Sequence, residues 1–391
     1  GDYLTAIGRQ ALYNNTTASS NTAVGYQSLY ANTTGSVNVA VGREALAYNT
    51  TASYNTSIGY YALRNNTTGA YNNAHGYSAL VLNTTGGFNQ AFGIHALNDN
   101  TTGSSNNAYG FSALRSNTGS NNSAFGHDAL RLNTTASNNT AVGHQAMYTN
   151  TTGTGTAIGR YALYYSNGTA NVAVGGNTGT VDAALQNTTS GSYNTAMGVG
   201  SLSANTTASK NTAVGYQAAH FNTTGAEMVA VGSQSLYSNT TGERNTATGW
   251  FSLVLNTTGS YNTAFGNQAL YANTTASNNT AVGYQAAYTN TTGTSNTALG
   301  QGSLYSNSVG TDNTSIGQAT LYNNTASDNT ALGVSALNGN TTGTHNIGVG
   351  RRPLLSNTSG SYNVAMGTDA LRSNTTASNN TAVGYQAAYT N

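Results

Sequence analysis

Residues 279–290 read "NTAVGYQAAYTN"; the same twelve residues recur at 380–391, and a near copy, "NTAVGYQSLYAN", covers 21–32. The glycine of "AVG", here called the repeat glycine, marks 23 copies of this unit. Of the 22 intervals between these glycines, 17 span 17 residues, four span 16, and one, from Gly175 to Gly198, spans 23. A fixed period of this kind is the signature of a repeat architecture.

The length and composition of the unit indicate a β-solenoid. Helical-hairpin repeats need about 33 residues or more, and the glycines and Asn-Thr-Thr-Gly runs are poor helix formers and good turn formers. We therefore expect an all-β fold, a parallel β-solenoid (β-roll) of about 23 coils with a 17-residue repeat. Residues 1–391 would form a single repeat array with an enlarged coil at 176–197. Both ends lie inside a repeat and show no polar cap, which favours a segment of a longer chain.

Apolar residues keep strict positions around the repeat glycine. Alanine lies two residues before it in 20 of 23 units, and leucine lies four residues after it in 18 of 23. These positions predict two short strands per coil, roughly "NTAVG" and "QALY". Asparagine first and glycine fourth in "NTTG" is typical of a type I turn between them.

Asparagine and glycine are the other fixed residues. Asparagine lies four residues before the repeat glycine in 20 units and seven after it in 21. Stacked amides predict hydrogen-bonded ladders, with turn geometry at positive φ as the alternative. The glycine itself implies positive φ or a close backbone approach. The predicted structural ladder residues are Asn21, Ala23, Gly25, Leu29, Asn32, Asn211, Ala213, Gly215 and Asn222.

Strand alternation raises the question of a second buried surface. Adjacent strand residues face opposite ways, so Ala213 and Val214 cannot both point inward, and the same holds for Ala269 and Leu270 if "QALY" is a strand. Apolar residues on both faces predict a side-by-side homo-oligomer, a trimer or a filament. The alternative is a flattened monomer with partly exposed valines, which His75 and Thr248 at the valine position favour.

The composition points away from catalysis and nucleic acid. Charged residues make up 5% of the chain and the net charge is +1, so no basic footprint for nucleic acid is present. No stretch approaches 18 apolar residues, and no catalytic motif occurs, so we expect no membrane span, no cofactor and no enzyme activity. His127 and His144, one period apart, should stack, and beside Asp128 they are interpreted as a solvated pair rather than a metal site.

Tyrosine supplies the candidate contact surface. Many of the 27 tyrosines lie one or five residues after the repeat glycine, or five before it. Packing is the favoured interpretation, and stacking on sugar rings is the alternative. The possible glycan-contact residues are Tyr26, Tyr30, Tyr284, Tyr288 and Trp250. The six extra residues after Gly175 predict a loop with Asp182 at its tip, a weaker site candidate.

The 17 "NTT" runs are also N-x-T acceptor sequons. A glycan on each asparagine would break an internal amide ladder, whereas sugars on outward hydroxyls would not. Possible glycosylation is therefore placed on threonine, for example Thr33, Thr34, Thr223 and Thr224. Ice binding is disfavoured, because adjacent threonines in a turn point apart.

The units Asn21–Ala23–Val24–Gly25 and Asn211–Ala213–Val214–Gly215 resemble the head repeats of YadA-type trimeric autotransporter adhesins, whose signature is "N-x-A-I-G-x-x-A". They are also similar to β-solenoid repeats of bacteriophage tail fibres. The resemblance covers almost the whole chain, but the 17-residue period and the regular "NTT" depart from the shorter adhesin units. It implies a left-handed, trimeric β-roll on an extracellular fibre. We expect this chain to be the shaft of a structural extracellular fibre or filament, with possible decoration by glycans. The alternative is an adhesin or phage receptor-binding fibre that recognises surface glycans.

Overall fold

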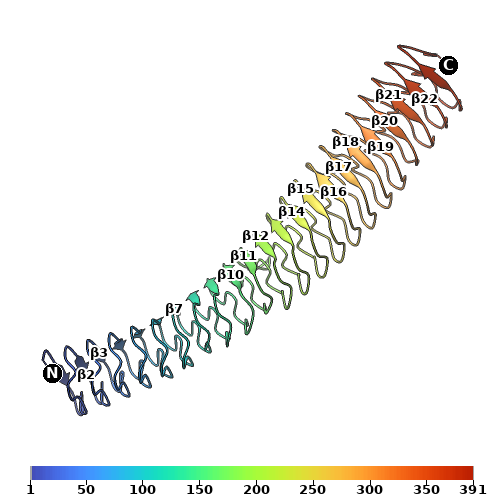
Figure 1. Cartoon of the computed structure of the whole chain (residues 1–391). Coiled ribbons are helices and arrows are strands. Elements are labelled where there is room, and N and C mark those ends of the chain that lie inside the picture. Colours follow the sequence, from blue (N-terminus) through green and yellow to red (C-terminus); the bar gives the residue numbers. More distant parts are fainter. Residues whose placement is uncertain (1, 391) are drawn as a thin grey trace. The chain divides into compact units, whose positions relative to one another are not determined.

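The computed structural model describes residues 2–390, and the regular structure within them is all β (Figure 1). The chain divides into two compact units, Gly1–Asn194 and Thr195–Asn391. The first unit contains β1 (Thr5–Ile7), β2 (Thr22–Val24), β3 (Val39–Val41), β4 (Thr56–Ile58), β5 (Asn73–His75), β6 (Gln90–Phe92), β7 (Asn107–Tyr109), β8 (Ser123–Phe125), β9 (Thr140–Val142), β10 (Gly155–Ile158) and β11 (Asn171–Val174). The second contains β12 (Thr195–Met197), β13 (Thr212–Val214), β14 (Val229–Val231), β15 (Thr246–Thr248), β16 (Thr263–Phe265), β17 (Thr280–Val282), β18 (Thr297–Leu299), β19 (Thr314–Ile316), β20 (Thr330–Leu332), β21 (Ile347–Val349), β22 (Val364–Met366) and β23 (Thr381–Val383).

Within each unit, consecutive strands pair in parallel and in register. Ala23 lies opposite Ala40 in the first unit, and Ala264 lies opposite Ala281 in the second. Each repeat is therefore one coil of a solenoid, and the predicted fold class and period are confirmed. Every coil places equivalent positions of the repeat above one another, which is why a short motif can specify a long stack.

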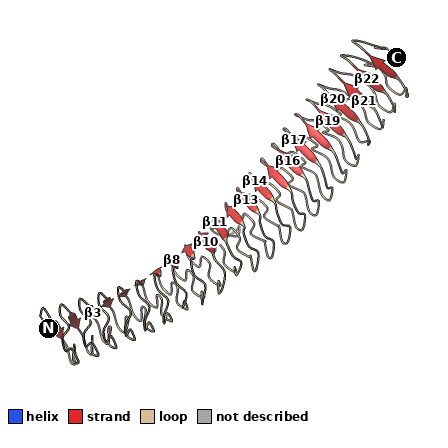
Figure 2. Ribbon diagram, viewed as in Figure 1, coloured by secondary structure: helices blue, strands red, loops and turns tan. Residues whose placement is uncertain are grey.

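Each coil carries one strand, not two (Figure 2). The expected second strand is a pair of tight turns: the N–H of Ser28 donates to the carbonyl of Gly25 at 3.4 Å, and that of Asn32 to Leu29 at 3.3 Å. Gln27 and Leu29 have φ of 52° and 50°, in the left-handed region. The fixed apolar positions after the repeat glycine suggested a strand here, but positive φ at every second residue bends the chain into turns.

The turn segment still bonds to its neighbours along the stack. Leu29 N–H donates to the carbonyl of Ala45 at 3.1 Å, and Gln27 N–H donates to that of Arg9 at 3.0 Å. A non-glycine residue in the left-handed region costs roughly 1 kcal/mol, so these bonds and the packing of the leucine must hold the geometry.

The turns also change which residues are inside. Ala269 and Leu270 are both fully buried, because the backbone turns between them. The expectation that one of this pair faces outward is wrong. The core is a thin column of such alanines and leucines together with the strand alanine, exemplified by Ala23 and Leu29, which are also fully buried.

Both predicted causes for the repeat glycine, a positive φ and a close backbone approach, are present. Gly215 has a φ of +137°, and a Cβ on it would lie 2.5 Å from the carbonyl oxygen of Gly232. The close approach follows from the stack, since each repeat glycine packs on the next. A side chain at this position would separate two coils.

The "NTTG" segment differs from a hydrogen-bonded type I turn. The Asn32 side chain, rather than its backbone, closes the segment, with Nδ2 donating to the carbonyl of Gly35 at 2.9 Å. The backbone N–H groups of Thr33 and Thr34 donate to the carbonyl of Thr50 in the next coil. The segment is thus hydrogen-bonded to the equivalent segment of the next coil.

Candidate functional site

The asparagine seven residues after the repeat glycine forms a buried amide ladder. Asn32 Nδ2 donates to Asn15 Oδ1 at 3.1 Å, and Asn222 Nδ2 donates to Asn205 Oδ1 at 3.3 Å. Asn222 also donates to the carbonyl of Gly225 at 2.9 Å. Both Nδ2 hydrogens are thereby used, which satisfies a buried polar group without charge.

The asparagine four residues before the repeat glycine forms a second ladder through the backbone. Asn21 Oδ1 accepts the N–H of Asn38 at 2.8 Å, and Asn211 Oδ1 accepts that of Met228 at 3.0 Å. Neither Asn21 nor Asn32 has positive φ, so the alternative role for these asparagines is wrong. Left-handed φ occurs instead at the residue before the asparagine of this second ladder. Tyr54, which precedes Asn55, has a φ of 62°.

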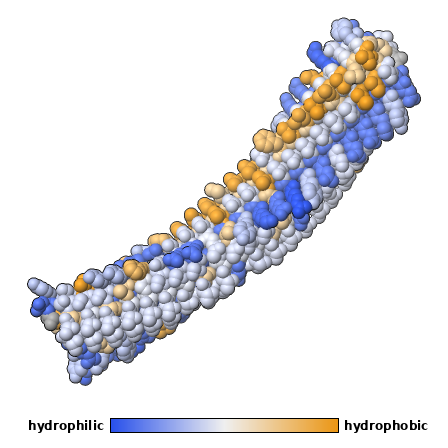
Figure 3. All heavy atoms as spheres, viewed as in Figure 1, coloured by the Kyte–Doolittle hydropathy of each residue, from blue (hydrophilic) through white to orange (hydrophobic). Residues whose placement is uncertain are grey.

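The outward strand face, defined as the residues three and one before each repeat glycine, is partly or fully exposed. The residue one before the glycine is apolar or aromatic except at Thr248, and the residue three before it is threonine in 14 of 23 coils. Ala213 is fully buried, whereas Val214 beside it is partly exposed, and Phe265 at the same position is 57% exposed. Figure 3 shows apolar side chains along the edge of each unit that carries the strands in Figure 2. No Asp, Glu, Lys or Arg occupies either position of this face.

Aromatic residues stack along part of the outward strand face in the first unit. The ring centroids of His75 and Phe92 are 4.6 Å apart, those of Phe92 and Tyr109 are 4.7 Å apart, and those of Tyr109 and Phe125 are 5.0 Å apart. His75 therefore belongs to an aromatic column.

The predicted tyrosine surface is several columns rather than one. Tyr26, one residue after its repeat glycine, lies beside the guanidinium of Arg43, with 5.6 Å to the ring centroid. Tyr30, four residues later in sequence, stacks on Tyr13 at 5.4 Å. Trp250 contacts Phe251, and it is half-exposed.

The side chain two residues after the repeat glycine separates these two columns. Glutamines at this position bond to one another along the stack, as Gln285 Nε2 does to Gln268 Oε1 at 2.8 Å. Where small residues replace them, at Gly302 and Ala319, a hollow of about 130 Å³ opens. The sequence did not single out this position.

Tyrosines line the hollow of the second unit. Tyr284 is one lining residue, and Tyr305 and Tyr322 form a wall with their rings stacked at 4.8 Å. Tyr288 stacks on Tyr305 at 5.1 Å and extends that wall. Of the predicted contact residues, Tyr284 therefore lines the hollow, and Tyr288 lies next to its wall.

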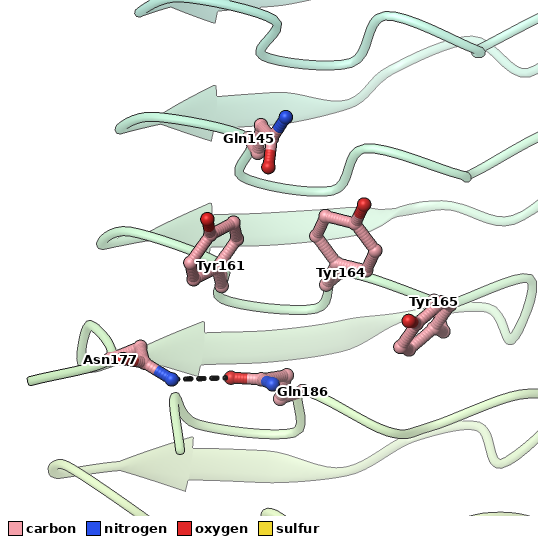
Figure 4. A pocket seen from close by; sticks show the side chains of 6 residues that line it. All are labelled: Gln145, Tyr161, Tyr164, Tyr165, Asn177 and Gln186. Carbon is pink, nitrogen blue, oxygen red and sulfur yellow. Dashed lines mark hydrogen bonds between the residues drawn. The ribbon is translucent and has the colours of Figure 1, made fainter. Parts of the chain in front are cut away.

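A larger hollow of about 240 Å³ lies beside the enlarged coil in the first unit (Figure 4). Its lining residues are Gln145, Tyr161, Tyr164, Tyr165, Asn177 and Gln186. The Tyr161 and Tyr164 rings are nearly perpendicular, at 76° with 5.5 Å between centroids, and Tyr164 and Tyr165 meet at 79° and 4.6 Å.

The inserted loop differs from expectation in one respect. Residues 178–180 form its exposed tip, and Asp182 lies at its base, half-buried. Asp182 Oδ1 accepts hydrogen bonds from Gln186 Nε2 at 3.3 Å and from Asn177 Nδ2 at 3.5 Å. The regular pattern resumes at 183–185, so counting by period misplaced Asp182.

Burial raises the pKa of the Tyr164 hydroxyl above its ordinary value, and the neighbouring phenols of Tyr148, Tyr165 and Tyr161 raise it further. This phenol therefore stays protonated at neutral pH and can donate a hydrogen bond. Tyr288 has its pKa raised by the same causes, burial first and then Tyr271 and Tyr305.

The threonines of "NTT" divide into two classes. Thr33 Oγ1 donates to the carbonyl of Thr50, and Thr223 Oγ1 to that of Thr240, each at 3.0 Å. Thr34 and Thr224 are exposed. The preceding Asn32 and Asn222 are fully buried, so an Asn-linked glycan is incompatible with the folded coil.

The histidine pair stacks as expected, with 5.3 Å between the ring centroids of His127 and His144. His127 Nδ1 lies 3.0 Å from Asp128 Oδ2. Residues 2–390 contain no group of three His, Cys, Asp or Glu placed to hold a metal ion. Over the same residues, no helix long and apolar enough to cross a bilayer is found.

Comparison with known proteins adds no family: neither the protein-family models nor the curated protein sequences contain a match to this chain. Function must therefore be argued from the two exposed features described above, the outward strand face and the tyrosine-lined hollows.

Proposed function

We propose that this chain is a structural segment of an extracellular fibre, in which copies of the chain associate through their outward strand faces. The observation that carries the proposal is the row of partly or fully exposed apolar and aromatic side chains on that face, where neither unit places an Asp, Glu, Lys or Arg. Contiguous exposed apolar surface is uncommon on monomers and marks an interaction site.

A second copy of the same chain is the partner that fits best. The side chains of the outward strand face repeat at the strand spacing, about 4.8 Å per coil. A matching surface needs the same rise and the same alternation of threonine and apolar residues, which another copy supplies. Resemblance to YadA-type head repeats and phage tail fibres supports a trimer and an extracellular location.

The test is the size of the assembly in solution. Phe265→Thr, Leu299→Thr and Leu332→Thr together remove three apolar side chains that are 57%, 42% and 44% exposed. Threonine already occupies this position at Thr248, so the coils should tolerate it. We expect the parent chain to sediment as an oligomer and the triple variant as a monomer with an unchanged circular dichroism spectrum.

A matched control removes equally exposed apolar side chains elsewhere on the second unit. Leu255→Thr, Val309→Thr and Val334→Thr, at 41%, 58% and 47% exposed, lie off the outward strand face. This variant should remain oligomeric. A parent chain that stays monomeric up to high concentration, or a control that dissociates equally, would overturn the proposal.

The alternative function, an adhesin or receptor-binding fibre, is favoured by a separate observation. Both hollows combine tyrosine rings with side-chain amides. Ligand sites commonly pair aromatic surface with a few placed polar groups. Such a fibre would use the outward strand face for assembly and the hollows for recognition of a glycan.

A further inference from the structure

The hollow beside the enlarged coil combines three tyrosine rings with three side-chain amides. Its volume, about 240 Å³, is below the range of about 300–1,000 Å³ that is typical of drug-sized ligands. We propose that it binds one neutral pyranose ring of a glycan, an inference that rests on the glycan-recognising alternative above.

The tyrosine rings give the hollow apolar walls at right angles. Tyr161 and Tyr165 each stand nearly perpendicular to Tyr164, and Tyr164 is held from behind by a parallel ring, Tyr148, at 5.1 Å. A pyranose has one face of C–H groups that packs on an aromatic ring, and edges of hydroxyls that need partners. Crossed rings offer a face for stacking and a side wall that fixes orientation.

Amide groups stand on both sides of the rings. In Figure 4, Gln145 lies on one side, toward which the Tyr161 and Tyr164 hydroxyls point, and Asn177 and Gln186 lie on the other. Elsewhere glutamines at the Gln145 position bond to each other, as Gln27 does to Gln10 at 2.9 Å.

The neighbours of Gln145 along the stack are Asp128 and Tyr161 at the same position. Within residues 2–390, no hydrogen bond of the Gln145 amide to another side chain is found. Its carbonyl and amino groups therefore remain free for a ligand that alternates donors and acceptors, as sugar hydroxyls do.

The insertion holds the opposite wall rigid. Asn177 Oδ1 accepts the N–H of Gly179 at 2.7 Å, and Gln186 Oε1 accepts that of Ala183 at 2.9 Å. Asn177 Nδ2 also donates to Gln186 Oε1 at 3.3 Å. A wall ordered before binding reduces the entropy that a ligand must overcome.

Charge selects a neutral sugar. No lining residue is charged, and two carboxylates lie close by: Asp182 contacts Gln186, and Asp128 raises the pKa of Tyr164. Two guanidinium groups balance these carboxylates: Arg131 Nη1 lies 3.6 Å from Asp128 Oδ1, and Arg160 lies 4.8 Å from the Tyr161 ring centroid. Neither arginine lines the hollow, so the carboxylate of an acidic sugar would lose water there without gaining an ion pair.

Saturation-transfer NMR on the full chain tests the inference directly. The probes are the methyl β-pyranosides of glucose, galactose and N-acetylglucosamine, with glucuronate as the anionic comparison. We expect at least one neutral probe to bind with a dissociation constant on the order of 1 mM, and glucuronate to bind roughly tenfold more weakly. Silence from all neutral probes, or strongest binding of glucuronate, would overturn the proposal.

Two variants locate the site, and a third controls for it. Tyr165→Ala removes a half-exposed wall, and Gln145→Leu removes the free amide; each should weaken the neutral probe about tenfold. Tyr193→Ala removes a 63% exposed tyrosine of the same enlarged coil outside the hollow, and binding should not change.

Equal loss in Tyr193→Ala, or no loss in either site variant, contradicts this location. Sedimentation of the same samples separates the two proposals. If the chain forms oligomers but binds no sugar, only the proposed sugar site is contradicted. If the chain binds sugar as a monomer, only the proposed assembly through the outward strand face is contradicted.

Discussion

The interior of a coil and its side face, meaning the coil surface away from the outward strand face, follow different rules. Asn83 in the first unit and Asn256 in the second make the same two bonds, at 2.8 Å to an asparagine and 2.9 Å to a glycine carbonyl. On the side face, the residue two after the repeat glycine changes from Gln285 to Gly302 to Ala319 over three successive coils. The interior is fixed because each coil must match the next, and the side face is free to specialise.

This comparison predicts that interior changes act through the whole stack, whereas side-face changes act locally. Stability in a repeat array is close to a sum of neighbour contacts, so one mismatched interior residue damages two interfaces. A side-face residue changes a surface and leaves the coil path intact.

The largest effect is expected from Gly215→Val. Valine would need a φ of +137° and would place Cβ 2.5 Å from the Gly232 carbonyl oxygen, so two coils must separate. We expect a loss of roughly 5 kcal/mol or more, at the upper end for single substitutions. Thermal unfolding followed by circular dichroism measures it.

The control is Tyr216→Val, the same new side chain at the exposed neighbouring residue, which should change stability by about 0.5 kcal/mol or less. Hydrogen exchange should show the damage concentrated in coils around Gly215. Equal melting temperatures for the two variants would contradict the close packing of successive repeat glycines.

Asn256→Leu is expected to have an intermediate effect. Leucine has a similar shape but leaves two buried groups unpaired, Asn239 Oδ1 and an Nδ2 hydrogen of Asn273, whereas the carbonyl of Gly259 still accepts from Asn245 Nδ2. Unsatisfied buried groups cost about 1–3 kcal/mol each, and relaxation should leave a net loss of about 2–4 kcal/mol in chemical denaturation.

Asn267→Leu is the matched change on the side face, because Asn267 is exposed. It should be nearly neutral. If both variants unfold at the same denaturant concentration, the amide ladder contributes nothing beyond shape.

Much of the interior could be predicted from the sequence, because a residue that recurs every 17 positions must stack on itself. Ala23, Gly25, Asn32 and the coil period follow from that rule. The second strand could not be excluded, since Gln27 and Leu29 are not residues that favour positive φ. A signal was present: Gly302 at the Gln27 position, with φ 60°, indicates left-handed backbone there.

The side face could be predicted only in part. Tyrosine positions were visible, but whether Tyr26 and Tyr30 share a surface depends on the turn between them. The hollow at the enlarged coil depends on how the insertion folds. The triplet Ala183-Ala184-Leu185 resembles the regular Ala-Leu pair and marks where the pattern resumes, which a fixed count from Gly175 conceals.

The smallest effect is expected from removing a charge on the side face, where ion pairs are exposed to solvent. Arg244 Nε lies 2.9 Å and Lys210 Nζ 3.3 Å from the Glu227 carboxylate, and their hydrogen bonds hold the pKa of Glu227 below its ordinary value. A depressed folded pKa stabilises the folded chain above the unfolded pKa of about 4.3, and that contribution is lost as pH falls through the folded pKa.

We therefore expect Glu227→Gln to be slightly less stable than the parent chain at neutral pH, and the difference in melting temperature to vanish below about pH 4. Glu243→Gln, which alters an exposed carboxylate without an ion pair in residues 2–390, should show no such pH dependence. The difference should also shrink at high salt, because the pair is open to solvent. If the difference in melting temperature between the parent chain and Glu227→Gln instead grew as the pH fell, the folded pKa of Glu227 would be raised rather than lowered. That result would contradict the observed contacts with Arg244 and Lys210.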